Sequence, residues 1–327
     1  MSCGWCYGSE ARLACGKCKK RVFCSRACQV QDWKRGHKQW CGRSGEAGFE
    51  FEVREALGSK GLGVFALVDM KRGFKIMAER PVATRHGKEE KEEPAATRAA
   101  VDALLPVGGS REDKIALNGM SLDAEVHSTG TGLFVRMSRV NHDCVPNALH
   151  HYHAPSGVKL LVACRDISAG EEVTMSYLPT ESQDALLGGS LTRAQFLALK
   201  WRFVCGCRAC SDPKLNAKIE ELRERDARIL KLGQRGDFAQ ALRCGEAILR
   251  LYDDLQESHK LYAKTYYEMF QLAVARRKTL AKAKGYIKLA HDNYLHFLGD
   301  AVTDETLEMY ALLVKSPAAH RAYLAAD

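Results

Sequence analysis

The seven residues Asn141-His142-Asp143-Cys144-Val145-Pro146-Asn147 carry the most specific pattern in this chain. The Asn-His pair supplies hydrogen-bond donors and acceptors, the cysteine can bind a metal, and Pro-Asn favours a tight turn. The stretch therefore predicts a turn that combines polar ligand contacts with a metal ligand.

Three other segments carry the residue types of a functional site. Ala163–Tyr177 predicts a strand, a turn and a second strand that ends on Tyr177. Ser59–Ala66 is a glycine-bearing turn that leads into a strand, and its glycines let the backbone approach a ligand or take a positive φ. This turn is not a dinucleotide fingerprint, because no third glycine opens a helix. Trp201–Cys210 places aromatic residues directly against a cysteine cluster.

Eleven of the thirteen cysteines, together with His37, fall into groups with the spacing of zinc ligands. Structural zinc takes four Cys or His ligands in closed tetrahedral sites, and short turns present pairs separated by two or three residues to one ion. The first two groups draw on Cys3-x2-Cys6, Cys15-x2-Cys18, Cys24-x3-Cys28 and His37-x3-Cys41; the third comprises Cys205, Cys207, Cys210 and, as the expected fourth ligand, Cys144. We therefore expect three structural zinc ions.

A secreted disulfide framework is the main alternative for so many cysteines. No apolar segment typical of a secretory signal precedes Cys3, and disulfides are rare in reducing compartments. Zinc binding thus fits a protein of the nucleus, the cytoplasm or both. No stretch approaches the ~20 apolar residues that a bilayer-spanning helix needs, so we expect no membrane contact.

The 327 residues suffice for two or three domains with real cores. The formal net charge of +9 counts cysteines as neutral. Eleven thiolates with three Zn²⁺ would lower it to about +4, so direct nucleic-acid binding is not expected. A basic run near the N-terminus could contact acidic partners, although such a run is more often a solvated face. It comprises Lys17, Lys19, Lys20, Arg21 and Arg26.

The expected fold class is mixed, with a small zinc module, a β-rich domain and a helical domain. The expected divisions are residues 1–43 for the zinc module, 49–180 for the β-rich domain, 181–212 for a linker loop with a cysteine-rich segment, and 213–327 for the helices. The helical periodicity is loosely similar to a tetratricopeptide-type stack. It predicts helices at Leu215–Leu232, Asp237–Leu255, His259–Arg277 and Leu280–Leu298, with short helices at Asp304–Val314 and Ala318–Ala325.

This set of motifs resembles the SET-domain protein lysine methyltransferases, and with residues 3–41 as a MYND zinc finger it is similar to their SET-and-MYND branch. The resemblance of the SET part runs from about Glu52 to Ser211. It implies that the MYND ligands interleave, with Cys3, Cys6, Cys24 and Cys28 on one zinc and Cys15, Cys18, His37 and Cys41 on the other. It also implies that Asn141–Cys144 passes through a loop closed by the strand ending in Tyr177, a pseudoknot that holds S-adenosylmethionine.

The resemblance further implies individual roles. Tyr177 would be the catalytic residue, aligning the amine of a target lysine with the methyl group. Phe134, Tyr177 and Trp201 would line the substrate channel. The cofactor contacts would be Lys60, Gly61, Leu62, Gly63, Asn118, Ser138, Asn141, His142, Tyr177 and Phe203.

The expected function is S-adenosylmethionine-dependent methylation of lysine in a histone or another protein, by a monomer that binds protein partners through its MYND finger and helices. The alternative is a MYND-based scaffold or transcriptional co-regulator with a weak or inactive SET domain. Tyr177 as a plain core tyrosine, and His142 as a purely structural residue, are the simpler interpretations. Trp201 stands where relatives have tyrosine, and Leu62 where they tend to have a polar side chain. These departures concern substrate and methylation degree more than activity class.

Overall fold

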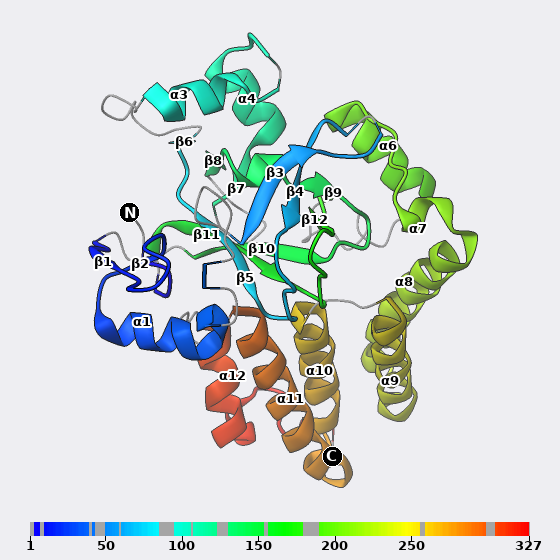
Figure 1. Cartoon of the computed structure of the whole chain (residues 1–327). Coiled ribbons are helices and arrows are strands. Elements are labelled where there is room, and N and C mark those ends of the chain that lie inside the picture. The colour runs from blue at the N-terminus through cyan, green and yellow to red at the C-terminus, as the bar shows by residue number, and fades with distance from the viewer. Residues whose placement is uncertain are drawn as a thin grey trace. The chain divides into compact units, whose positions relative to one another are not determined.

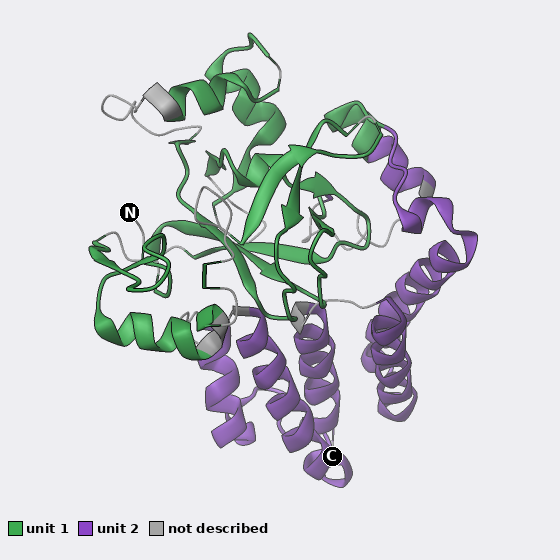
Figure 2. Ribbon diagram, in the orientation of Figure 1, with its two compact units in different colours: residues 1–177, 197–203 green, residues 178–196, 204–327 purple. Residues whose placement is uncertain are grey.

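The computed structural model describes residues 3–6, 10–38, 41–42, 50–58, 60–84, 95–105, 107–122, 130–153, 156–178, 190–255, 259–298 and 305–326. The chain separates into two compact units (Figure 2), the first formed by residues 1–177 with 197–203 and the second by 178–196 with 204–327. The mixed fold class expected from the sequence is confirmed. The finer division into four domains stays a prediction.

The first unit begins with a small cysteine-rich module. A two-stranded hairpin of β1 (Leu13–Ala14) and β2 (Val22–Phe23) precedes α1 (Arg26–Asp32), which continues into a π-helical turn, η1 (Trp33–His37). Ser25 caps α1 by accepting a hydrogen bond from the Cys28 amide at 3.2 Å. Phe23 has no exposed surface, so the module packs around one aromatic ring and its cysteines.

Three small sheets follow in the first unit (Figure 1). The strand orders are β3 (Phe51–Glu55), β4 (Leu62–Ala66), β12 (Glu172–Met175), β9 (Asn141–His142) in one sheet; β10 (Ala148–His153), β11 (Val158–Ala163), β5 (Lys75–Glu79) in the second; β6 (Ala83–Thr84), β8 (Thr131–Leu133), β7 (Met120–Ser121) in the third. All neighbours pair antiparallel except β12 and β9, which pair parallel.

Burial explains how these strands assemble. Strand β11 is buried at every position, and its Lys159 reaches the Ser121 carbonyl at 2.6 Å. Apolar side chains from all of the larger strands share one core, which includes Val64, Met77, Phe134, Leu161 and Val173. Two short helices, α3 (Ala95–Asp102) and α4 (Arg111–Asn118), flank this frame, and a capping box between Ser110 and Asp113 starts α4.

The second unit is helical. Its helices are α7 (Arg208–Ser211), α8 (Pro213–Gln234), α9 (Phe238–Leu255), α10 (His259–Val274), α11 (Leu280–Leu298) and α12 (Glu305–Lys315), with 3₁₀ turns η4 (Arg277–Thr279) and η5 (Pro317–Ala319); α6 (Ser190–Trp201) contributes residues to both units. Helix α8 starts with Asp212 as its N-cap and Pro213 in the first turn. Helices adjacent in sequence pack together from α8 to α12.

The predicted short helix Ala318–Ala325 is wrong. The chain forms the 3₁₀ turn η5 and then irregular turns, with Leu324 at a φ of 52°. The Leu324 amide bonds to the Val274 carbonyl at 3.0 Å and the Ala326 amide to the Ala275 carbonyl at 3.1 Å. These two amides therefore donate to carbonyls at the end of α10 and do not form hydrogen bonds within a helix of their own.

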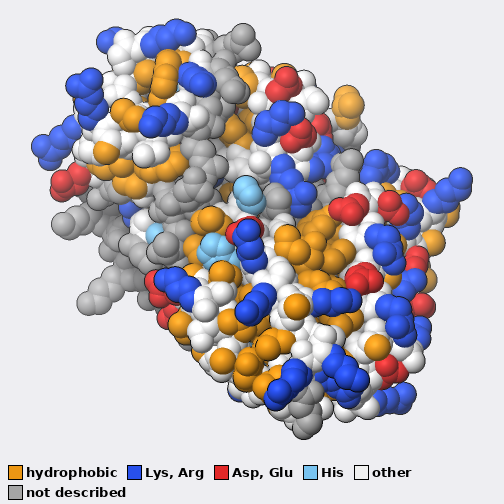
Figure 3. Space-filling view, turned by 90° about the horizontal axis from the view of Figure 1, so that it is seen from below, with side chains coloured by type: hydrophobic (Ala, Val, Ile, Leu, Met, Phe, Trp, Pro, Cys, Tyr) orange, Lys and Arg blue, Asp and Glu red, His pale blue; other side chains and the backbone are white. Residues whose placement is uncertain are grey.

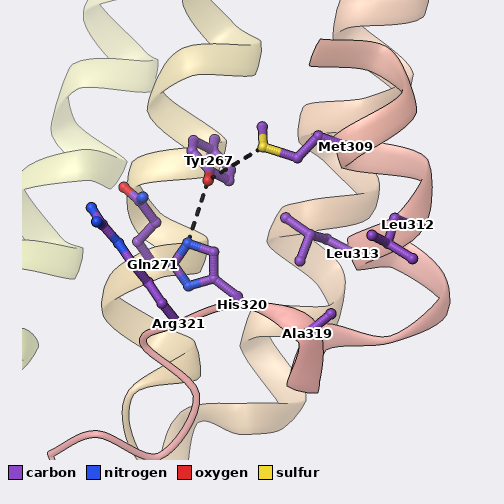
Figure 4. Close-up of a pocket in the computed structure, with 8 residues that line it drawn as sticks. All are labelled: Tyr267, Gln271, Met309, Leu312, Leu313, Ala319, His320 and Arg321. Atoms are coloured by element: carbon purple, nitrogen blue, oxygen red, sulfur yellow. Dashed lines mark hydrogen bonds between the residues drawn. The ribbon is translucent and has the colours of Figure 1, made fainter. Parts of the chain in front are cut away.

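A cavity of about 350 Å³ lies in the helical unit between α10, α12 and the turns after α12 (Figure 4). Apolar side chains of α12, among them Met309 and Leu313, line one side. On the other side the Tyr267 hydroxyl and His320 Nε2 are 3.3 Å apart. This cavity belongs to the helical unit alone.

Two surface properties bear on partners. On the face shown in Figure 3, Lys and Arg side chains are interspersed with acidic and hydrophobic ones and form no continuous basic stripe. Among the described residues, no helix combines the length and hydrophobicity that crossing a membrane requires.

Candidate functional site

The predicted site is organised by the parallel pairing of β9 with β12. Asn141 lies opposite Thr174 and His142 opposite Met175, and the Asp143 amide continues the ladder by donating to the Met175 carbonyl at 3.0 Å. The Asn147 side chain closes the turn, accepting from the Thr174 amide at 2.8 Å and donating to the Glu172 carbonyl at 2.8 Å. The stretch 141–147 and the strand leading to the tyrosine are thus joined along their length.

Tyr177 follows β12 and is held at both its backbone and its hydroxyl. Its amide donates to His142 Nδ1 at 3.0 Å, and its hydroxyl donates to the Val140 carbonyl at 2.8 Å. Burial, and after it the negative charge of Glu172, raise the pKa of the phenol. Tyr177 is therefore a neutral phenol at physiological pH, with oxygen lone pairs as its remaining hydrogen-bonding capacity.

An aromatic cluster surrounds Tyr177. Its ring centroid lies 5.1 Å from Trp201, 5.3 Å from His142 and 6.3 Å from Phe203, and the Phe203 ring is edge-on. His142 also lies 6.0 Å from Phe203. The Trp201 indole donates to the Leu117 carbonyl at 3.0 Å, which fixes its ring at the end of α4. The structure thus brings together four of the aromatic or imidazole residues predicted from sequence.

The glycine-bearing turn before β4 lies against Asn141. Gly61 has a φ of 71°, which disfavours any residue with a Cβ, and its carbonyl accepts from the Ala56 amide at 2.8 Å. Asn141 Nδ2 donates to the Leu62 carbonyl at 3.1 Å and to Glu172 Oε1 at 2.8 Å. Lys60 Nζ pairs with Glu172 Oε2 at 2.9 Å. Both ends of the Glu172 carboxylate therefore bind residues predicted to hold the cofactor.

Three predicted site residues have mainly internal contacts. Asn118 uses its amide on the Leu105 carbonyl at 2.6 Å and the Lys114 carbonyl at 2.9 Å. Ser138 donates to the Phe134 carbonyl at 2.6 Å, within the turn that precedes β9. Phe134 has no exposed surface and packs in the same core against which Tyr177 lies. Their roles toward cofactor or substrate stay predictions.

The two zinc sites expected in the N-terminal module have the interleaved ligand sets. Ligand atoms of Cys3, Cys6, Cys24 and Cys28 lie within 4.8 Å of one another, as do those of Cys15, Cys18, His37 and Cys41. Contacts between sulfurs measure 3.5 Å for Cys6–Cys24 and Cys24–Cys28, and 3.8 Å for Cys15–Cys41. A tetrahedron with Zn–S distances of ~2.3 Å has sulfurs ~3.8 Å apart, so these donor sets fit zinc.

The electrostatics of these thiols also call for a cation. Burial, and then the neighbouring thiols of Cys15 and Cys18, raise the pKa of Cys41 to about 12. The three thiols of this set cannot all ionise without a positive charge among them, and zinc ligation requires the thiolate form.

A third cluster joins Cys144 to the cysteines around α7. The sulfurs of Cys144, Cys205, Cys207 and Cys210 lie within 4.8 Å of one another, which is the predicted third ligand set. Cys144 Sγ also lies 3.3 Å from His142 Nε2. Three clusters in the described residues therefore match the three predicted zinc sites.

Comparison with known families agrees with this geometry. Residues 3–41 match the MYND finger and residues 61–178 match the SET domain. The chain therefore carries a MYND finger followed by a SET domain.

Several curated proteins are similar to this chain. Histone-lysine N-methyltransferase set5 of Schizosaccharomyces pombe is 29% identical over 51% of this chain and 53% of its own length. Histone-lysine N-methyltransferase ASHR1 of Arabidopsis thaliana is 26% identical over 67% of this chain and 48% of its own. Human histone-lysine N-methyltransferase SMYD3 is 24% identical over 74% and 60%. The chain thus spans about half to three-fifths of the length of these relatives.

Charged residues that support the sites of this protein were not predicted from sequence. Arg21 binds Asp32 through two atoms, Nε at 2.8 Å and Nη2 at 2.9 Å, and Asp32 lies 3.0 Å from Nδ1 of the zinc-ligand candidate His37. Arg21 also binds Glu50 at 3.0 Å and the Gly4 carbonyl at 3.0 Å. The position of Arg21 between the ligands Cys18 and Cys24 could have indicated a structural role, but the sequence does not specify which residues it binds.

Proposed function

We propose that this protein is an S-adenosylmethionine-dependent protein-lysine N-methyltransferase acting on a histone or another protein. The observation that carries the proposal is the position of Tyr177. Its neutral hydroxyl is fixed to the Val140 carbonyl inside an aromatic cluster, and its backbone is bonded to His142 of the Asn-His pair. The names of the similar proteins, which include histone-lysine and N-lysine methyltransferases, support the same class.

S-adenosylmethionine supplies an activated methyl group on a sulfonium. The residues here fit such a ligand through a glycine turn, a polar pair and an aromatic face. Lys60–Gly63, Asn141, His142 and Phe203 would hold it, with Phe203 offering a ring face to the adenine. The intact contacts between these segments support a working site.

The chain's own contribution is alignment and desolvation. A lysine amine attacks only as the neutral base, and aromatic burial disfavours its ammonium form. Because its pKa is raised, Tyr177 does not act as the base. Its phenolic oxygen, oriented by the bond to Val140, accepts weak contacts from the amine or the methyl hydrogens and so sets the line of attack.

The test is methyl transfer from labelled S-adenosylmethionine to cell protein, with Tyr177→Phe as the variant. Phenylalanine keeps the ring contacts with Trp201 and His142 but removes the hydroxyl, so transfer should fall by about 10²-fold while cofactor binding persists. Tyr152→Phe changes another tyrosine that packs on the same core and is the control. Wild-type turnover by Tyr177→Phe would remove Tyr177 from the mechanism.

We further propose that the MYND finger and the helical unit bind protein partners, that the protein works as a monomer without direct nucleic-acid contact, and that it acts in the nucleus, the cytoplasm or both. The interspersed charges of Figure 3 support the absence of a nucleic-acid surface on that face. Light scattering after gel filtration tests the monomer, and fractionation of cells tests the location.

A further inference from the structure

Glu172 lies at the centre of the candidate cofactor site, although its sequence position suggests only a strand residue beside a turn. It belongs to β12 and stands opposite Phe65 of β4. Its Oε1 accepts from Asn141 Nδ2 at 2.8 Å and its Oε2 binds Lys60 Nζ at 2.9 Å. One carboxylate thereby connects the strand that carries Asn141 to the glycine turn.

The Asn141 amide has only one orientation that satisfies these neighbours. Its two N–H groups meet two acceptors, the Leu62 carbonyl and Glu172 Oε1. Rotating the amide by half a turn would set its oxygen against both acceptors, which is repulsive. The oxygen Oδ1, which has no hydrogen bond among the described residues, is therefore the atom that Asn141 presents to a ligand.

Gly63 provides the space for this arrangement. A Cβ at Gly63 would lie 2.8 Å from Glu172 Oε1 and 3.0 Å from Asn141 Nδ2, closer than non-bonded atoms approach. Among the described residues, Gly61 but not Gly63 has a positive φ. A Cβ at the second glycine of the turn would thus displace the ends of the Glu172 and Asn141 side chains, whereas its backbone conformation does not call for glycine.

We propose that Glu172 is a positioning residue that fixes the Asn141 amide so that Oδ1 faces the α-ammonium group of the methyl donor. The proposal rests on the proposed function, because it assigns the ligand end that Asn141 recognises. An acceptor at this point distinguishes ligands that carry an amino-acid group from the same nucleoside without one. Neutral glutamine at position 172 would keep the size of the side chain but could turn its own NH₂ toward Asn141 and release the amide.

The experiment is calorimetric titration with two ligands. S-adenosylhomocysteine carries the amino-acid group, and 5′-deoxy-5′-methylthioadenosine lacks it. Glu172→Gln should raise the dissociation constant of S-adenosylhomocysteine about tenfold, while that of methylthioadenosine should change less than about twofold. Gly63→Ala should give the same selective loss by crowding the pair without changing a charge. Thermal unfolding and zinc content check that each variant is folded.

Glu171→Gln is the matched control. Glu171 is the adjacent carboxylate, but it binds Arg165 at 2.6 Å, the Ser168 amide at 3.0 Å and Asn147 at 3.1 Å, away from Asn141. Its replacement should leave the ratio of the two affinities unchanged. Unchanged affinities in Glu172→Gln, or an equal loss for both ligands, would overturn the positioning role even if the wild type methylates protein. A wild type that binds neither ligand would overturn the proposed function itself.

Discussion

Replacing Arg21 by methionine should destabilise the MYND finger more than any surface change in its basic run. Arg21 forms ion pairs with two nearly buried carboxylates, because the side chains of Asp32 and Glu50 are only 6% and 4% exposed. Methionine fills a similar space but leaves both charges without this partner. Removing one partner of a buried pair costs ~3–5 kcal/mol, and the Arg21 side chain is 20% exposed, so about 3 kcal/mol is expected.

The consequence is measurable as zinc release. A loss of about 3 kcal/mol raises the opened fraction of the finger about 100-fold, and a chromogenic chelator should take up its zinc correspondingly faster. Arg26→Met is the control, because Arg26 is exposed in the first turn of α1. Arg21→Lys should fall in between, because an ammonium cannot reproduce the paired contact with Asp32. If Arg21→Met released zinc no faster than Arg26→Met, the assignment of Arg21 as a structural link would be refuted.

Three further outcomes are expected. Cys144→Ser should lower the metal content from three zinc ions toward two and weaken cofactor binding, measured by elemental analysis and titration, with both MYND ions retained; three ions and normal binding would exclude Cys144 as a ligand. Trp201→Phe should shift products toward higher methylation in mass spectra, because a smaller ring beside Tyr177 leaves more room; a wild type that already yields mainly trimethyl-lysine would contradict this. Burial raises the pKa of Glu171, but bonds from Arg165, the Ser168 amide and Asn147 outweigh it and lower the pKa overall. As pH falls below ~4.3, the Glu171 carboxylate therefore binds a proton in the unfolded chain before it does so in the folded one. The free energy of unfolding of the wild type should then fall relative to that of Glu171→Gln. If urea denaturation gave the same difference between the two proteins at every pH from 6 to 3.5, the prediction would be contradicted.

The zinc ligands could be predicted because their spacing is a local constraint. Two cysteines separated by two residues can reach one ion whatever the rest of the chain does, and each predicted set is found together. The motif resemblance placed Tyr177 beside His142, and the β9–β12 pairing with the bond from the Tyr177 amide to His142 shows how they meet, while their roles stay predictions. Helix periodicity likewise predicted α8 to α12 because it is a local property.

The predictions were less complete where the answer depends on distant partners. Ala318–Ala325 has the composition of a helix, yet its amides close short local turns and the Leu324 amide bonds to Val274, the last residue of α10. Arg21 looked like one of several solvated cations, but its partners are 11 and 29 residues away. Glu172 stood beside Glu171 as one of two similar acids, and only the fold shows that one faces Asn141 and the other Arg165. Sequence patterns identify side-chain types but do not specify which side chains meet.

Two glycines link these observations. A Cβ at Gly4 would lie 2.8 Å from Arg21 Nε, and a Cβ at Gly63 would lie 2.8 Å from Glu172 Oε1. Neither glycine has a positive φ in the described chain, so neither is needed for turn conformation. Each instead leaves room for a charged side chain that joins a ligand-bearing turn to another segment: Gly4 lies between zinc-ligand candidates, and Gly63 closes the predicted cofactor turn. In this protein, a glycine with ordinary backbone angles inside a binding turn therefore indicates that a charged side chain from another segment approaches there. That side chain is the one that a methyl group on the glycine would displace.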